Sequence, residues 1–343
     1  MSACLLGAVS GLLNFKKEKK GGVRWHLNNM GKNLLVSFSG GETSGFMAQW
    51  IKNHLDDMYD EIVFVFANTG LENEQTLEFV QKCDEHFNLN VQWVEASVYH
   101  NERKGTGYNT VDFETASRKG EPFEDIIKKY GIPNQAFPHC TRELKLAPIN
   151  KFAKVWFNGE KYDTAIGIRI DEIDRMNDKY KEKRLVYPLI HKEMIPATKQ
   201  MINFYWKQMP FRLELKGYQG NCVNCWKKSN NKLYQIANEN PKSFDFTYNM
   251  ELKYGNPNGR KPKDKIIGYK TVICGDEEDN YEEPIYEIIP REEQRITFFR
   301  NHKSSLDILE EAKQFKGRIK DDSINEPTLF DNESCEVFSS CGD

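Results

Sequence analysis

A glycine-rich segment with the sequence SFSGGETSG, residues 37–45, carries the residue types best suited to chemistry. It follows a short apolar run at 34–38 and precedes a stretch at 43–55 whose apolar residues have helical spacing. Glycines in such a turn let the backbone close around phosphate, and the free N–H groups and dipole of a helix N-terminus attract anions. The segment has no GKS or GKT sequence, which excludes the common P-loop. A plain turn without a ligand would share this composition. The candidate phosphate-binding residues are Ser37, Ser39, Gly40, Gly41, Glu42, Thr43 and Ser44.

Three cysteines form a second candidate site. Cys140 lies in the sequence HCTRELKLAP, and Cys222 and Cys225 form a CxxC sequence about 80 residues further on. Three thiolates, two of them at CxxC spacing, suit an iron–sulfur cluster or zinc. Three unrelated buried thiols are the alternative, because a CxxC sequence alone is only suggestive.

The elements that must position these residues alternate along the chain. Apolar runs at 34–38, 62–66 and 91–95 predict strands, and the residues at 43–55 and 72–86 between them predict helices. Such alternation predicts a parallel sheet that is covered by helices on both faces. Further elements are expected as a long functional loop at 98–120, helices at 122–131 and 141–156, and strands at 163–168 and 185–190.

The second strand ends in the polar residues Asn68, Thr69 and Gly70. In open α/β sheets the carboxyl ends of the strands line the ligand crevice, so these residues are candidates for nucleotide binding. A helix cap that contains Asn and Thr is the structural alternative.

The glycine-rich segment resembles the SGGxxS loop of the PP-loop ATP pyrophosphatase superfamily, and residues from about 33 to 230 resemble the phosphoadenosine phosphosulfate (PAPS) reductase family. The resemblance implies an α/β fold with a doubly wound, mostly parallel sheet, of the adenine nucleotide alpha hydrolase-like type, and a smaller C-terminal helical region that contains cysteines. It also implies ATP or an adenylyl nucleotide as ligand, with Mg²⁺, and a segment at Asn68 beside the adenosine. Two further segments match the family. Gly167 and Arg169 stand where it contacts the nucleotide, with Arg175 nearby, and Tyr187-Pro188-Leu189 matches the strand before its metal domain.

The cysteine pattern resembles that of sulfonucleotide reductases, in which a Cys-Cys pair followed by Arg, Lys and Pro combines with a distant CxxC to hold a 4Fe–4S cluster. This chain has His139 where that pattern has a cysteine. Either His139 is the fourth ligand, or three thiolates hold a cluster with one open iron, the arrangement of tRNA-thiolating PP-loop enzymes. Zinc with Cys274 as the fourth ligand is a further alternative. Lys145 matches the lysine of the reductase pattern, and the resemblance makes Lys145 and Arg169 candidate catalytic residues.

The tail also contains Cys341-Gly342, which resembles the mobile C-terminal Cys-Gly of sulfonucleotide reductases. The resemblance makes Cys341 a candidate nucleophile and Cys335 a candidate resolving thiol. An incidental exposed cysteine is the alternative.

Composition limits the function classes. The 343 residues include 48 Lys and Arg against 51 Asp and Glu, a net charge of −3, which argues against a wholly basic nucleic-acid-binding surface. No apolar run is long enough to span a bilayer, so we expect a cytoplasmic protein without a membrane partner. We expect an N-terminal extension at 1–32 with Met30 as a candidate start, a nucleotide-binding domain at 33–210, a metal-binding helical region at 211–320 and a flexible cysteine-containing tail at 321–343.

Three functions compete at this point. The first is an enzyme that cleaves ATP to AMP and pyrophosphate, adenylates a substrate and delivers sulfur to it, with a nucleic acid or a thiol-donor protein as partner; the intact SGGxxS sequence favours it. The second is a sulfonucleotide reductase that releases sulfite through Cys341, favoured by the cysteine pattern. The third is a nucleotide-binding regulator without turnover.

Overall fold

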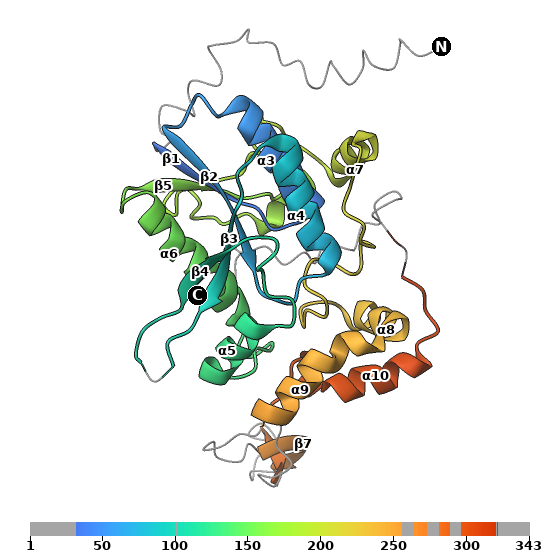
Figure 1. Ribbon diagram of the computed structural model, residues 1–343. Helices are drawn as coiled ribbons and strands as arrows, with labels where there is room; N and C mark the ends of the chain where they lie inside the picture. Colours follow the sequence, from blue (N-terminus) through green and yellow to red (C-terminus); the bar gives the residue numbers. More distant parts are fainter. Residues whose placement is uncertain are drawn as a thin grey trace, which may run out of the picture.

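The computed structural model describes residues 32–100, 102–255, 264–272, 281–288, 296–319 and 321. Its centre is a six-stranded sheet with the order β4-β3-β2-β1-β5-β6 (Figure 1). Neighbouring strands run parallel except for the antiparallel pair β3 and β4. The expected α/β fold with a mostly parallel sheet is therefore confirmed. The strands are β1 (Asn33–Ser37), β2 (Glu61–Asn68), β3 (Gln92–Ser97), β4 (Gly107–Val111), β5 (Tyr162–Ala165) and β6 (Leu185–Val186).

Helices cover both faces of this sheet (Figure 1). Because successive strand residues point to opposite faces, Leu34 and Val36 of β1 enter one core while Leu35 enters another. The first core also contains apolar residues of α3 (Glu42–His54), α4 (Glu74–Phe87) and α7 (Lys199–Gln208), and the second contains those of α6 (Ala147–Trp156). The sheet is thus doubly wound, as expected.

The C-terminal part of the described chain is mainly helical. The helices α5 (Glu121–Tyr130), α8 (Asn230–Glu239), α9 (Asp245–Tyr254) and α10 (Ser305–Gln314) contribute to one core cluster. Because α5 comes from the sheet-forming half of the chain, this cluster joins the two halves. The strands β7 (Asp264–Val272) and β8 (Tyr281–Ile288) pair as an antiparallel hairpin, which the sequence did not predict.

Several expected elements differ in detail. The region 98–120 is not one long loop, because β4 pairs there with β3 at the edge of the sheet. The expected strand at 185–190 has only the two residues of β6, and β5 ends at Ala165. The expected helix at 141–156 starts with a π-helical turn, Arg142–Leu146, and becomes α-helical where Pro148 occupies the first turn of α6. Proline lacks an N–H, so it is tolerated at that position.

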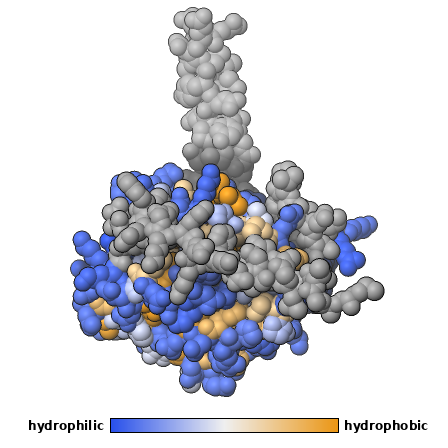
Figure 2. Space-filling view, turned by 90° about the horizontal axis from the view of Figure 1, so that it is seen from above, coloured by the Kyte–Doolittle hydropathy of each residue, from blue (hydrophilic) through white to orange (hydrophobic). Residues whose placement is uncertain are grey.

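Figure 2 shows a face that is mostly hydrophilic, with small hydrophobic patches among polar residues. Within the described ranges, none of the helices has the length and apolar character needed to cross a membrane. The predictions made for residues 1–31, including Met30, and for Cys274, Cys335 and Cys341 lie outside the described residues.

Candidate functional site

The glycine-rich loop, residues 39–44 here, lies at the carboxyl edge of the sheet, between the end of β1 at Ser37 and the first turn of α3. Gly40 has a φ of +80°, and a Cβ there would lie 2.6 Å from Thr76 Cγ2, so this position requires glycine for the shape of the loop. Gly41 is the N-cap of α3, in extended backbone with φ −99° and ψ 160°. A Cβ on Gly41 would have no neighbour closer than 3.7 Å, so an alanine side chain would fit at this position without a steric clash.

Hydroxyl groups hold the loop in a closed turn. The Ser44 hydroxyl donates to Gly41 O at 2.9 Å and accepts from the Ser39 hydroxyl at 3.0 Å and from Ser39 N at 3.2 Å. Ser44 is buried, whereas Ser39 and Thr43 remain partly exposed. The sequence predicted all three hydroxyls as phosphate donors; as placed, Ser44 shapes the loop, and Ser39 and Thr43 face outward enough to meet a ligand.

Arg169 reaches this loop from the segment that follows β5. Its Nη1 lies 3.1 Å from Thr43 Oγ1 and 3.1 Å from Glu172 Oε2, and its Nε lies 3.1 Å from Asp171 Oδ1. Arg175 Nη1 also contacts Glu172, at 2.6 Å. The chain therefore brings a buried guanidinium beside the glycine-rich loop, with carboxylates that fix its orientation.

Gly167 lies against the same helix terminus. A Cβ at Gly167 would be 3.3 Å from Ser44 Cα, tighter than ordinary contact. Glycine therefore allows the segment after β5 to approach the N-terminus of α3. Nucleotide binding by Gly167 stays a prediction.

Three side chains from later in the chain contact the loop, and the sequence did not predict any of these contacts. Trp206 Nε1 donates to Glu42 O at 2.8 Å, and Arg212 binds the Glu42 carboxylate through two hydrogen bonds of 3.0 and 3.1 Å. Asn221 Nδ2 donates to Ser39 O at 2.7 Å. Burial raises the pKa of Glu42, and the Arg212 charge opposes that rise. The only signal in the sequence was that Asn221 directly precedes the CxxC.

The polar residues after β2 are occupied by protein contacts. Asn68 is fully buried; its Nδ2 donates to Glu95 Oε1 at 2.6 Å and to Ser117 O at 2.8 Å, and its Oδ1 accepts from Gly70 N at 3.1 Å. This arrangement shapes the strand end. Nucleotide binding by Asn68, Thr69 and Gly70 stays a prediction.

A buried carboxylate follows these residues. Glu72 accepts from Thr69 N at 2.9 Å and from the Thr69 hydroxyl at 2.8 Å, and Lys145 Nζ lies 3.9 Å away. Burial raises the pKa of Glu72, whereas Lys145 and the bonds from Thr69 lower it. Lys145, itself nearly buried, is also one of the residues that line the cavity described next.

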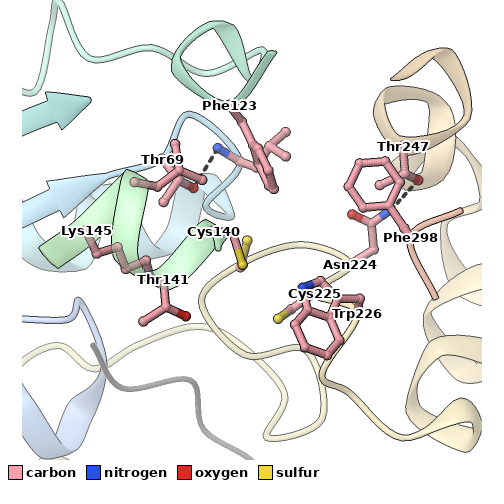
Figure 3. A pocket seen from close by; sticks show the side chains of 13 residues that line it. Thr69, Phe123, Cys140, Thr141, Lys145, Asn224, Cys225, Trp226, Thr247 and Phe298 are labelled. Atoms are coloured by element: carbon pink, nitrogen blue, oxygen red, sulfur yellow. Dashed lines mark hydrogen bonds between the residues drawn. The ribbon is translucent and has the colours of Figure 1, made fainter. Parts of the chain in front are cut away.

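The structure brings the three predicted cysteines to one cavity. Its lining includes Cys140 from the sheet side and both cysteines of the CxxC turn. Figure 3 shows the side chains of Cys140 and Cys225 pointing into the space between the two parts of the chain. We call this space the cysteine cavity; its lining residues are Thr69, Leu71, Phe123, Cys140, Thr141, Leu144, Lys145, Cys222, Asn224, Cys225, Trp226, Thr247 and Phe298.

The donor chemistry of this cavity fits a soft metal, since thiolates are the ligands that iron–sulfur clusters and zinc prefer. As positioned, however, no group of three or more His, Cys, Asp and Glu side chains in the part of the chain that the structure describes could hold an ion. His139 does not line the cavity: its Nε2 lies 2.9 Å from Gly131 O. Burial lowers the pKa of His139, which favours the neutral ring. Metal binding therefore stays a prediction.

Fold and site together define a doubly wound α/β protein with a glycine-rich loop at a helix N-terminus and a thiol-lined cavity at the same sheet edge. Residues 33–195 match the family model described as the phosphoadenosine phosphosulfate reductase domain. The chain belongs to this family, a family of nucleotide-binding enzymes of sulfur metabolism.

Known relatives add little about the reaction. The uncharacterized nin region protein ORF290 of Escherichia phage lambda is 32% identical over 202 residues, which cover 58% of this chain and 67% of the relative. An uncharacterized protein of Methanocaldococcus jannaschii is 23% identical over 251 residues, 70% of this chain but only 46% of that relative. The crystal structure of PAPS reductase from Candida auris, a phosphate complex, matches with a TM-score of 0.32 and 11% identity, covering 55% of this chain and 77% of that one.

Proposed function

We propose that the chain binds ATP, or another adenylyl nucleotide, with its phosphates at the glycine-rich loop, and uses it for sulfur transfer at the cysteine cavity. One observation carries the proposal. The loop after β1 and the cavity beside Thr69, which follows β2, lie at the carboxyl edge of two adjacent parallel strands. Ligands of open α/β sheets bind at this edge.

The proposed reaction has two steps. A substrate oxygen attacks the α-phosphorus of ATP, the bond to the β-phosphate oxygen breaks, and pyrophosphate leaves with Mg²⁺. A sulfur nucleophile then attacks the adenylated carbon, and AMP leaves with the oxygen. The N-terminus of α3 and the Arg169 guanidinium would stabilise the phosphate charge, because backbone N–H groups and a bidentate cation favour anions.

The cysteine cavity would supply the sulfur chemistry. A 4Fe–4S cluster, or zinc, held by Cys140, Cys222 and Cys225 would provide a centre that binds sulfur. The chain's own contribution would be Lys145, a lining residue whose ammonium lies 3.9 Å from Glu72 and would attract an anionic sulfur or phosphate group. A nucleic acid is our proposed sulfur acceptor.

Sulfonucleotide reduction is the second candidate, because the family match and the cysteine pattern both favour it. An assay separates the two. The protein is purified without oxygen, its iron and acid-labile sulfide are measured, and it is incubated with either ATP and Mg²⁺ or adenylyl sulfate and a reductant. AMP and pyrophosphate from ATP support the first function. Sulfite from adenylyl sulfate, without pyrophosphate from ATP, would instead support sulfonucleotide reduction.

A further inference from the structure

One segment of the chain contacts the glycine-rich loop and then forms the CxxC turn. It begins in the last turn of α7 with Trp206, which donates to Glu42 O, and Arg212 then binds the Glu42 carboxylate. At its far end Asn221 donates to Ser39 O, and the next residue is Cys222. We call residues 206–223 the connecting segment.

The end of the connecting segment is fixed on two sides. Asn221 O accepts from Asn73 N at 3.0 Å, and Val223 N donates to Leu71 O at 2.9 Å. Glu72 and Cys222 form an isolated antiparallel bridge between these two bonds. The backbone around Cys222 is therefore held against the residues that follow β2, so a displacement at Asn221 must move Cys222 or break these bonds.

The Asn221 side chain also faces the place where a phosphate would bind. A Cβ on Gly41 would lie 3.7 Å from both Asn221 Nδ2 and Oδ1, so the amide stands directly beside the N-cap of α3. A side-chain amide has two N–H donors, and the bond to Ser39 O uses one of them. The second can donate to an anion that sits at the helix N-terminus.

We propose that Asn221 is a nucleotide-binding and positioning residue, which contacts the bound phosphates and transmits occupancy of the glycine-rich loop to Cys222 in the cysteine cavity. This inference rests on the proposed nucleotide binding. Its physical basis is that Asn221, whose amide contacts the loop, and Cys222, which lines the cavity, are consecutive residues. Nucleotide binding then orders the CxxC turn before sulfur chemistry begins.

Hydrogen–deuterium exchange tests the proposal in the full-length protein with ATP and Mg²⁺ at saturation. In the wild type we expect nucleotide to slow exchange of the Asn73 and Val223 amides about fivefold, because both bond the anchored turn. In Asn221→Ala we expect about tenfold weaker ATP affinity, since one hydrogen bond to a charged group is lost. At saturating ATP this variant should show no slowing.

Two further variants sharpen the test. Asn221→Asp keeps the size of the side chain but cannot donate and adds a negative charge, so it should lose both affinity and slowing even if the alanine variant folds poorly. Gln219→Ala is the matched control: it lies on the same segment, and its side chain accepts from Lys216 N at 3.0 Å instead of contacting the loop. It should behave as the wild type.

The outcomes are distinct. Wild-type affinity in both Asn221 variants, or undiminished slowing at saturation, would overturn the role of Asn221 and leave the proposed function standing. The same holds if wild-type protein binds ATP without any change in exchange. Absence of ATP binding by the wild type would overturn both proposals.

Discussion

Two neighbouring glycines of the loop allow a sharp test of the phosphate site, because the structure predicts opposite effects for them. Gly41→Ala places a methyl group at the N-cap of α3 with no atom closer than 3.7 Å. The free energy of unfolding should fall by less than about 1 kcal/mol, the usual cost of an alanine N-cap. The same methyl group would stand where phosphate must approach the first N–H groups of the helix.

The expected loss of binding is large. Two charge-assisted hydrogen bonds at about 1.5–3 kcal/mol each amount to at least about a 100-fold loss of ATP affinity. For Gly40→Ala, in contrast, we expect a large loss of folding stability. It has a φ of +80° and would place Cβ 2.6 Å from Thr76 Cγ2, so left-handed strain of about 1–2 kcal/mol adds to overpacking of about 1–3 kcal/mol.

Titration calorimetry with ATP and Mg²⁺ and denaturant unfolding measure both quantities on the same samples. We expect a stable Gly41→Ala protein that does not bind ATP and a destabilised Gly40→Ala protein. Gly41→Ala with wild-type affinity would refute the proposal that the loop closes around phosphate. A strong loss of stability in Gly41→Ala would contradict the conclusion that a methyl group fits at this position.

The remaining predictions concern the cavity, the C-terminal helices and the tail. Cys140→Ser should lower iron and acid-labile sulfide at least to half while ATP affinity stays unchanged; unchanged metal content in anaerobic protein would contradict a shared site. Burial raises the pKa of Glu251, so its contribution to stability is full below about pH 4.5 and is lost as pH rises through the raised pKa. Wild-type stability measured by urea unfolding should therefore decline relative to Glu251→Gln between pH 5 and 8, and a constant difference would contradict this. Cys341→Ser should leave ATP turnover unchanged but lower any sulfite release from adenylyl sulfate; sulfite release at full rate would exclude Cys341 as a nucleophile.

Much of the sheet could be predicted because its central strands are buried on both faces. The run at 62–66 is continuously apolar, and the run at 34–38 is interrupted only by Ser37, as expected for strands without a solvent-facing side. The edge strand β4 has the sequence GYNTV with mostly half-exposed or exposed residues, so its pairing with β3 depends on a tertiary partner that no local pattern shows. The strand expected at 185–190 ends after two residues, before Pro188, which has no N–H for a ladder.

Only part of the candidate site could likewise be predicted from the sequence. The glycine-rich loop and the convergence of Cys140 with the CxxC turn followed from local composition and from family resemblance. The contacts of Trp206, Arg212 and Asn221 with the loop did not, because they span more than 160 positions and have no characteristic spacing. Asn68 shows the opposite case: its position at a strand end suggested a ligand, whereas its amide is bonded within the protein.

The most direct test of the central claim is the product analysis of anaerobic protein incubated with ATP and Mg²⁺, with Gly41→Ala as the control. Nucleotides are separated by chromatography and pyrophosphate is measured enzymatically. The account predicts AMP and pyrophosphate in equal amounts from the wild type, and neither from Gly41→Ala. ADP and phosphate, equal turnover in both proteins, or sulfite from adenylyl sulfate with no pyrophosphate from ATP would contradict it.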